Sequence, residues 1–192
     1  MDKNVLSITD NFGINFLNTQ IKTRGKILDL INDNEDIVEW INLQKELIND
    51  DELRLQLNVL LENIPPIEQI KIFREEIHEK VNKSIEGNFP IEQWKLYLDQ
   101  ELEQLPLYLQ FNDSSGALLP VKHGFEGFKT IVLLQISKLM TNDLIHKIKH
   151  CANPNCILVF LDKSGKRKWC SMKICGNRNK VAQHKTRHSH EN

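Results

Sequence analysis

Two stretches, Cys151-Ala-Asn-Pro-Asn-Cys156 and Cys170-Ser-Met-Lys-Ile-Cys175, decide how the C-terminal quarter of this 192-residue chain folds. Each begins and ends with a cysteine, and together they hold all four cysteines of the chain. The thirteen residues between them are enough for one hairpin, which would bring the two pairs together. The spacing predicts one structural Zn²⁺ ion held tetrahedrally by Cys151, Cys156, Cys170 and Cys175.

Two disulfides would use the same cysteines, but they would need an oxidising compartment. The first residues, Met1-Asp2-Lys3-Asn4, lack the basic and apolar regions of a signal peptide. No apolar run approaches the roughly 20 residues that cross a bilayer. We therefore expect a soluble cytoplasmic protein with no membrane partner. His150 adjoins the first cysteine and could replace it as a ligand, but the even pairing favours four cysteines.

The net charge of −1 hides a division within the chain. Residues 146–192 carry eleven Lys and Arg against two acids, whereas residues 1–145 carry fourteen against twenty-four. A basic tail on an acidic body is typical of proteins that contact nucleic acid. The alternative is that the basic part docks on its own acidic body.

Residues 1–145 read as a mainly α domain, which we call the helical body. Helices are expected around Phe12 to Leu17, after Asp33-Asn34-Glu35-Asp36, from Asp50-Asp51 to Pro65, over about 66–86, after Pro90, and over about 125–140. Residues 22–26 read as a polar break. Residues 107–111 and 117–121 flank a turn-rich loop and predict one β-hairpin.

Residues 146–192, which we call the zinc module, read as a ribbon-like or treble-clef-like unit of one hairpin and one helix. We expect a strand over residues 157–161, a turn at 162–165 and a returning strand over 167–169. Asn153-Pro154-Asn155 is typical of a turn that directs backbone amides at ligand sulfurs. Ser171 is expected to cap a helix that begins near Met172, with Cys175 in its first turn.

The zinc module closely resembles the CGNR zinc-finger family. The resemblance rests on the Cys151/Cys156 pair, Phe160-Leu161-Asp162, Trp169-Cys170-Ser171-Met172 and Cys175-Gly176-Asn177-Arg178. One departure is Ile157, where a glycine often follows the second cysteine. Members of the family typically carry a helical N-terminal ABATE domain, described as a stress-induced transcription regulator. The stretch Ile14-Asn15-Phe16-Leu17-Asn18-Thr19, followed by Arg24-Gly25 and residues 36–41, is similar to the start of that domain.

A helical wheel of the final residues divides the CGNR motif. Arg178 falls on the side of Cys175, where we expect a structural role, as a partner of Asp162 or of an acid of the helical body. Asn177 falls on the opposite side. That outward side and the hairpin predict a nucleic-acid contact surface: Lys166, Arg167, Lys168, Lys173, Asn177, Lys180, His184 and Arg187. The alternative is a solvated charged helix. Trp169 either stacks on a base or packs the hairpin.

The basic surface predicts nucleic-acid binding, and the resemblance implies a bacterial-type DNA-binding transcription regulator whose helical body senses a small-molecule effector or forms a homodimer. The alternative is a protein interaction adaptor, or an RNA-binding protein, in which the zinc is purely structural. Asn18 and Thr19 could line an effector pocket, although a buried hydrogen bond is the simpler role. The chain has no phosphate-binding glycine loop, no Ser/His/Asp order and no cysteine outside the zinc set, so we expect no enzyme.

Overall fold

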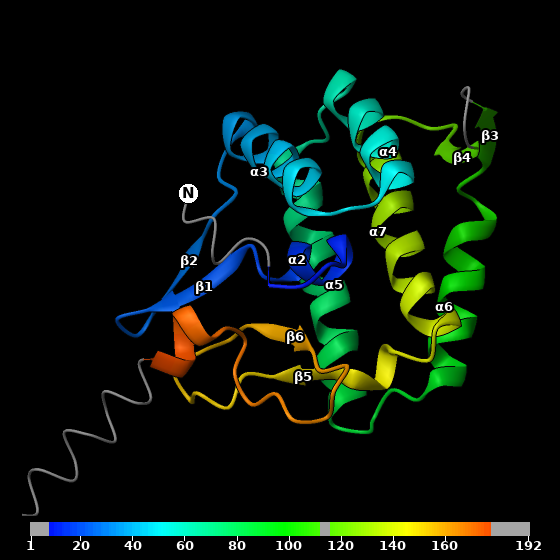
Figure 1. Ribbon diagram of the computed structural model, residues 1–192. Helices are drawn as coiled ribbons and strands as arrows, with labels where there is room; N and C mark the ends of the chain where they lie inside the picture. Colours follow the sequence, from blue (N-terminus) through cyan, green and yellow to red (C-terminus); the bar gives the residue numbers. More distant parts are fainter. Residues whose placement is uncertain (1–7, 112–115, 178–192) are drawn as a thin grey trace, which may run out of the picture.

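The computed structural model describes residues 8–111 and 116–177 and shows a mainly helical protein with small hairpins, which confirms the predicted fold class (Figure 1). Its helices are α2 (Phe12–Leu17), α3 (Asn34–Leu47), α4 (Asp51–Glu62), α5 (Ile67–Ile85), α6 (Ile91–Glu103) and α7 (Gly124–Thr141). Two short helical turns, η1 (Ile145–Lys147) and η2 (Met172–Gly176), lie in the C-terminal part. The strands pair antiparallel as β1 (Gln20–Thr23) with β2 (Lys26–Asp29), β3 (Leu107–Phe111) with β4 (Gly116–Pro120), and β5 (Ile148–His150) with β6 (Val159–Leu161).

The helix starts follow local capping chemistry. The Asp33 carboxylate accepts hydrogen bonds from the backbone N–H groups of Glu35 and Asp36 in the first turn of α3, which begins at Asn34. Asp50 accepts from the N–H of Leu53 in the same way at the start of α4. Each cap satisfies N–H groups that have no partner within the helix, so these short sequence signals predicted the starts correctly.

Helix α2 lies at the centre of the molecule, surrounded by α3, α5 and α7 (Figure 1). All six of its residues are buried. The rings of Phe12 and Trp40 lie 4.8 Å apart, and those of Phe16 and Phe128 lie 5.0 Å apart with their planes nearly perpendicular. Aromatic pairs of this kind add about 0.5–1.5 kcal/mol each beyond the burial of their surface. A helix of under two turns is therefore held by its neighbours and not by its own propensity.

The prediction of a plain polar break at residues 22–26 was wrong, because β1 and β2 form a hairpin there. Thr23 pairs with Lys26 across a two-residue turn, in which Arg24 has a φ of 49° and Gly25 a φ of 79°. Positive φ at both positions suits the tight hairpin turn whose twist matches that of the strands. Every residue of both strands is partly or fully exposed, so the strands lack the alternating pattern that marks a half-buried strand.

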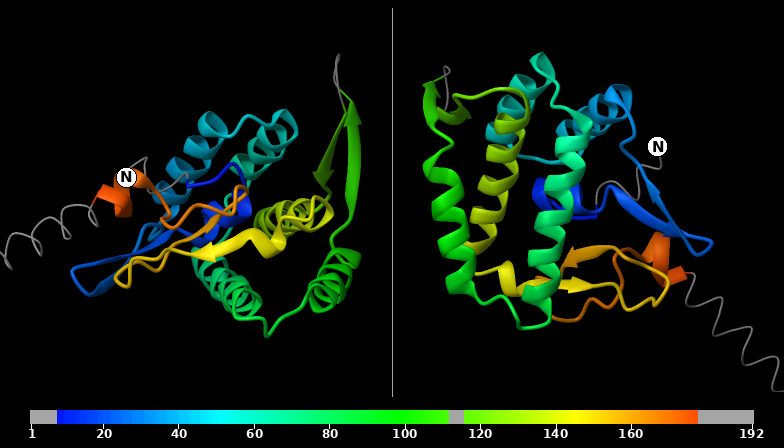
Figure 2. Two further views of the ribbon diagram at one scale, coloured as in Figure 1. Left: turned by 60° about the horizontal axis from the view of Figure 1, so that its bottom comes forward. Right: turned by 180° about the vertical axis from the view of Figure 1, so that it is seen from behind.

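The predicted hairpin at residues 107–121 is confirmed as β3 and β4, with Leu109 paired with Leu118. The views in Figure 2 agree with Figure 1 that this hairpin and the β5–β6 hairpin lie at different ends of the molecule. Within residues 8–111 and 116–177, no helix is both long and apolar enough to cross a membrane.

Candidate metal centre

The hairpin that leads to the cysteines differs from the prediction. Strand β6 pairs with β5, which precedes the first cysteine, and not with residues 167–169. Residues 167–169 form no strand, and the Lys168 carbonyl accepts from the Ala152 N–H at 2.9 Å. The guanidinium group of Arg167 donates to the carbonyls of Trp169, at 2.9 Å, and Cys170. The β5–β6 pairing brings Cys151 beside Leu158, whose carbonyl accepts from the Cys151 N–H at 3.1 Å.

Asn18 fixes this hairpin to the helical body. Its side-chain amide donates to the carbonyl of Val159 at 2.9 Å, and its side-chain oxygen accepts from the N–H of the same residue at 3.0 Å. Asn18 is buried, and Val159, Leu161 and Ile148 belong to the same apolar core as the helices. Asn18 therefore attaches the hairpin to the helical body. This agrees with the simpler of the two roles predicted for Asn18, a buried hydrogen bond. The boundary that we predict after residue 145 stays a prediction.

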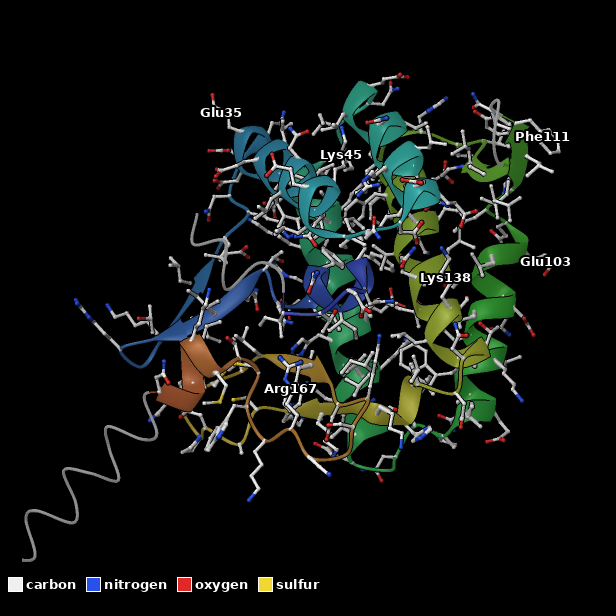
Figure 3. The ribbon with its side chains drawn as sticks, viewed as in Figure 1. Glu35, Lys45, Glu103, Phe111, Lys138 and Arg167 are labelled. Atoms are coloured by element: carbon white, nitrogen blue, oxygen red, sulfur yellow. The ribbon has the colours of Figure 1, made fainter. Side chains whose placement is uncertain are left out.

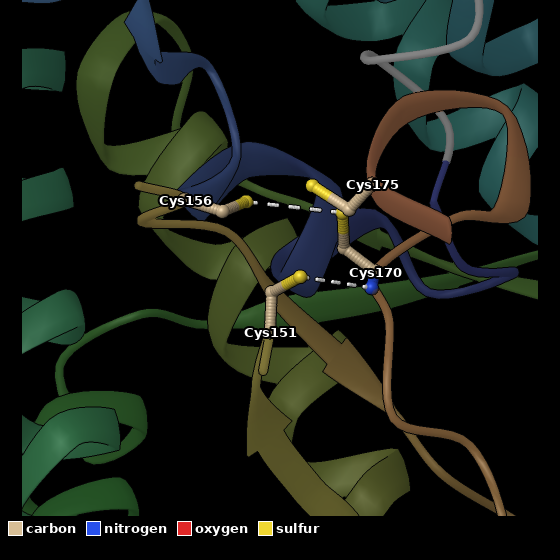
Figure 4. Close-up of side chains that lie close together, drawn as sticks. All are labelled: Cys151, Cys156, Cys170 and Cys175. Carbon is tan, nitrogen blue, oxygen red and sulfur yellow. Dashed lines mark hydrogen bonds between the residues drawn. The ribbon is translucent and has the colours of Figure 1, made fainter. Parts of the chain in front are cut away.

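The four cysteine sulfurs converge at one point (Figure 4). All four lie within 4.8 Å of one another, and Cys156 Sγ and Cys170 Sγ are 3.8 Å apart. Tetrahedral zinc with bonds of about 2.3 Å places its sulfur ligands roughly 3.8 Å from one another. The donor set and its spacing therefore fit one structural zinc ion, which confirms the predicted cofactor. Four thiolates close the coordination shell and leave no position for a reacting water.

Hydrogen bonds from the surrounding chain point at the sulfurs. The Cys170 N–H donates to Cys151 Sγ at 3.4 Å, and the Asn153 side-chain amide donates to Cys175 Sγ at 3.4 Å. The Asn153 carbonyl also accepts from the Cys156 N–H at 2.9 Å, which forms the expected turn between the first two ligands. Such outer contacts orient ligands and stabilise the charge of thiolates, so the site is prepared for a cation.

The last ligand sits in the π-helical turn η2. Ser171 begins this turn, and its hydroxyl oxygen accepts from the Lys173 N–H at 3.1 Å, so the predicted cap is confirmed. Cys175 and Gly176 are buried. A Cβ atom at Gly176 would lie 2.5 Å from the sulfur of Met172, so the flexible Met172 side chain packs over this glycine.

Hydrogen bonds among the cysteine thiols shift their pKa values in opposite directions. Hydrogen bonds from the thiols of Cys156 and Cys170 lower the pKa of Cys151. Donation to Cys151 raises the pKa of Cys156, and donation to Cys151 and Cys156 together with burial raises the pKa of Cys170. Zinc binds thiolates, so it must displace the protons that the raised pKa values of Cys156 and Cys170 hold on these two groups.

A small apolar cluster of Ile8, Leu158 and Phe160 lies against the cysteines, and Ile21 of β1 and Leu30 beyond β2 pack on it. Arg167 covers this cluster: its guanidinium group lies 4.7 Å from the centre of the Phe160 ring and donates to the carbonyl of Ile8 at 3.4 Å. Figure 3 labels Arg167 within the zinc module, beside the core of the protein.

Asp162 stabilises the turn after β6. Its side chain is buried and accepts hydrogen bonds from Lys149 Nζ at 2.8 Å, from the Ser164 hydroxyl at 3.1 Å and from the Arg167 N–H at 3.2 Å. The hydrogen bond from Lys149 is the main reason why the pKa of Asp162 is lowered to about 2. Arg178, for which Asp162 is one of the expected partners, lies outside the described residues.

The predicted nucleic-acid contacts divide into three groups. Lys166, Lys168, Lys173 and Asn177 are exposed, and Asn177 lies outward as the helical wheel predicts. Arg167 is half-buried, and three backbone carbonyls accept its hydrogen bonds. Lys180, His184 and Arg187 lie outside the described residues. The sequence did not reveal the role of Arg167, because nothing in its neighbours indicates that its donors turn inward.

A closed shell of four cysteines on a hairpin and a helical turn defines a structural zinc finger. Residues 147–188 match the family model of the CGNR zinc finger, which confirms the resemblance for this part of the chain. A comparison with curated proteins finds no match. The resemblance of the N-terminal part to an ABATE domain stays a prediction.

Proposed function

We propose that the zinc module contacts nucleic acid, DNA in the first instance, and that the protein acts as a transcription regulator. The observation that carries this proposal is a groove of about 530 Å³ beside the zinc cluster. Its lining includes the basic residues Lys166 and Lys168, the aromatic residue Trp169, and Ser171 at the start of η2. Basic side chains suit phosphates, and an aromatic ring suits a base.

The charge division supports the same proposal. The zinc module carries eleven basic residues against two acids, and one of these acids, Asp162, is buried and paired with Lys149. Arg167 also lines the groove, but its guanidinium group donates to backbone carbonyls. In this proposal Arg167 stabilises the groove and does not contact phosphates. Phosphate contacts are therefore assigned to the exposed lysines.

The proposal predicts binding that weakens steeply with salt. For duplex DNA, the logarithm of the affinity falls by about 0.9 for each phosphate contact per tenfold rise in salt. We expect the double variant Lys166→Glu/Lys168→Glu to bind weakly and to lower this slope by about 1 for each lost contact. Gel-shift titrations of the full chain at several salt concentrations measure both quantities.

A matched control is Lys83→Glu/Lys95→Glu, which makes the same change of charge at exposed positions of α5 and α6. Binding by this control should resemble that of the unchanged protein. If the two double variants bind equally well, or if the unchanged protein shows no binding, the proposal is wrong.

The adaptor alternative has its own supporting observation, since apolar side chains of the β3–β4 hairpin are exposed. The same titrations with single-stranded RNA test the RNA-binding alternative, because RNA recognition favours unpaired strands. Tighter binding of RNA than of duplex DNA would move the proposal to RNA.

Ligand sensing and dimerisation by the helical body belong to the same proposal, and the N-terminal resemblance to an ABATE domain supports them.

A further inference from the structure

The outer edge of β3 is open to another strand. Within the described residues, β3 has β4 as its neighbour on one side and no strand on the other. On β4, the Leu118 N–H donates to Glu52 Oε1 at 3.0 Å, and its carbonyl accepts from Gln56 Nε2 at 2.7 Å. Side chains of α4 therefore cover the outer edge of β4 and leave β3 as the exposed edge.

The register shows which backbone groups of β3 point outward. Leu118 faces Leu109, and since the N–H and C=O of Leu118 are used by α4, this is a pair without ladder hydrogen bonds. Pairs with and without ladder hydrogen bonds alternate along an antiparallel ladder. The Val121 N–H donates to the Pro106 carbonyl at 3.0 Å, which agrees with this alternation, since that pair lies three positions from the pair of Leu109 and Leu118. The N–H and C=O groups of Leu107, Leu109 and Phe111 therefore point away from β4.

The side chains at these positions form an exposed apolar surface. Leu109 is 53% exposed, Phe111 is 75% exposed, and Leu118 on β4 is 41% exposed. A Cβ atom at Gly116 would lie 3.2 Å from Leu109 and 3.4 Å from Phe111, so these two side chains lie together over that glycine. Figure 3 shows Phe111 at the periphery of the molecule.

Exposed edge strands usually carry a lysine, a proline or a bulge that prevents pairing with another chain. Strand β3, with the sequence Leu-Tyr-Leu-Gln-Phe, has no charged residue and no proline, and its register with β4 is unbroken. An edge without such protection indicates that a partner covers it.

We propose that β3 pairs antiparallel with β3 of a second copy of this chain, about a twofold axis at Leu109. In this register Leu109 faces Leu109 of the other copy, and Leu107 faces Phe111, so apolar residues meet on one face of the new sheet. Tyr108 faces Gln110 on the other face, which joins a hydroxyl to an amide. Each facing pair with outward backbone groups exchanges both of its hydrogen bonds, and no like charges meet.

The sequence of the strand favours a second copy over the chain's own C-terminal residues. Residues 178–192 hold four Lys and Arg and three His, with Val181 and Ala182 as their only aliphatic residues. They offer no alternating apolar side chains to match Leu109 and Phe111, whereas β3 offers these to itself. Twofold pairing of identical surfaces is also the commonest way in which soluble proteins form dimers.

This inference rests on the dimerisation part of the proposed function and is independent of the nucleic-acid contact. The β3–β4 hairpin and the β5–β6 hairpin lie at different ends of the molecule (Figures 1 and 2). Pairing through β3 therefore leaves both zinc modules accessible.

Sedimentation of the full chain without nucleic acid tests the inference over a wide range of protein concentrations. We expect a species of twice the 22.4 kDa chain mass. Leu109→Pro removes an outward N–H without breaking a hydrogen bond to β4, and Leu109→Lys places two like charges opposite each other at the axis. Each should raise the dissociation constant of the dimer by about 100-fold, because like charges or a missing donor at the pairing edge cost several kcal/mol.

Ile72→Lys is the matched control, because Ile72 is 70% exposed on α5, outside the hairpin. This variant should sediment as the unchanged protein does. Far-UV circular dichroism and zinc content should be the same in all four proteins, which excludes misfolding as a cause. A monomeric unchanged protein, or a dimer that both Leu109 variants leave intact, would overturn the inference. Loss of nucleic-acid binding alone would not affect it.

Discussion

The helical body and the zinc module differ in what holds them together. Around α2, rings such as Phe12, Phe16 and Trp40 are fully buried, and burial of apolar surface accounts for the fold. The apolar cluster beside the four cysteines is small, with Ile8, Leu158 and Phe160 as its buried members besides the ligands. Such a cluster cannot order a loop-rich segment by itself, so the metal must supply the difference.

Between the two lies the β5–β6 hairpin, which is continuous in sequence with the cysteines but belongs to the core of the body. Dependence on zinc should therefore begin after β5, at Cys151, and exclude β6. Zinc therefore stabilises the loops and η2, whereas the hairpin that connects to them is stabilised by the core of the helical body.

The largest effect is expected from Cys170→Ser, which removes one of four ligands. Structural zinc contributes on the order of 10 kcal/mol to the folding of small metal-dependent units, so the site should lose its ion. Metal analysis should fall from one zinc per chain to a small fraction, while far-UV circular dichroism keeps most of its helical signal. Ser171→Ala is the control and should keep the zinc. A Cys170→Ser protein with a full complement of zinc would contradict the site.

Trp40→Ala tests the other side of the comparison. Trp40 is fully buried against Phe12, and truncation of such a side chain costs about 3–5 kcal/mol of the free energy of unfolding. Denaturant titration should show this loss, and the folded variant should still bind one zinc per chain. Leu96→Ala, at an exposed position of α6, should change the stability little. Loss of zinc from folded Trp40→Ala protein would show that the two regions are not separable.

Asn18→Ala tests the contact between the helical body and the β5–β6 hairpin. It leaves the N–H and C=O of Val159 buried without partners, at about 1–3 kcal/mol each. Thermal and denaturant unfolding should both show the loss, with Asn88→Ala at an exposed position as the control. A stability equal to that of the unchanged protein would mean that the hairpin is held by its apolar side chains alone.

The smallest effect per group comes from a change of one pH unit, which alters the zinc affinity by about 1.4 kcal/mol for each displaced proton. The pKa values of Cys156 and Cys170 are raised in the metal-free cluster, so zinc must displace a proton from each of these two thiols near neutral pH. Affinity should therefore rise with pH, by about tenfold per unit for each displaced proton. Competition with a chelator at several pH values measures this slope. An affinity that is flat with pH would show that the thiols are already ionised.

The parts of the fold that the sequence predicted well depend on local chemistry. The caps Asp33 and Asp50 act within three residues, and the cysteine spacing defines a site by itself. The errors concern contacts that are distant in sequence or not encoded by a pattern. Nothing in the sequence around Asn18 indicates that it binds Val159, 141 residues away. The pairing of β6 with β5 was missed because β5 has three residues, too few to show the alternating pattern of a strand.

Hydrogen exchange of the full chain, compared with and without a zinc chelator, tests the central claim most directly. The claim is that one zinc ion orders residues 151–158 and 162–177, while the helical body and β5–β6 fold without it. We expect protection to be lost in those two segments, whereas α3, α5, α7, β5 and β6 keep theirs. Loss of protection throughout the chain, or in neither segment, would contradict the claim.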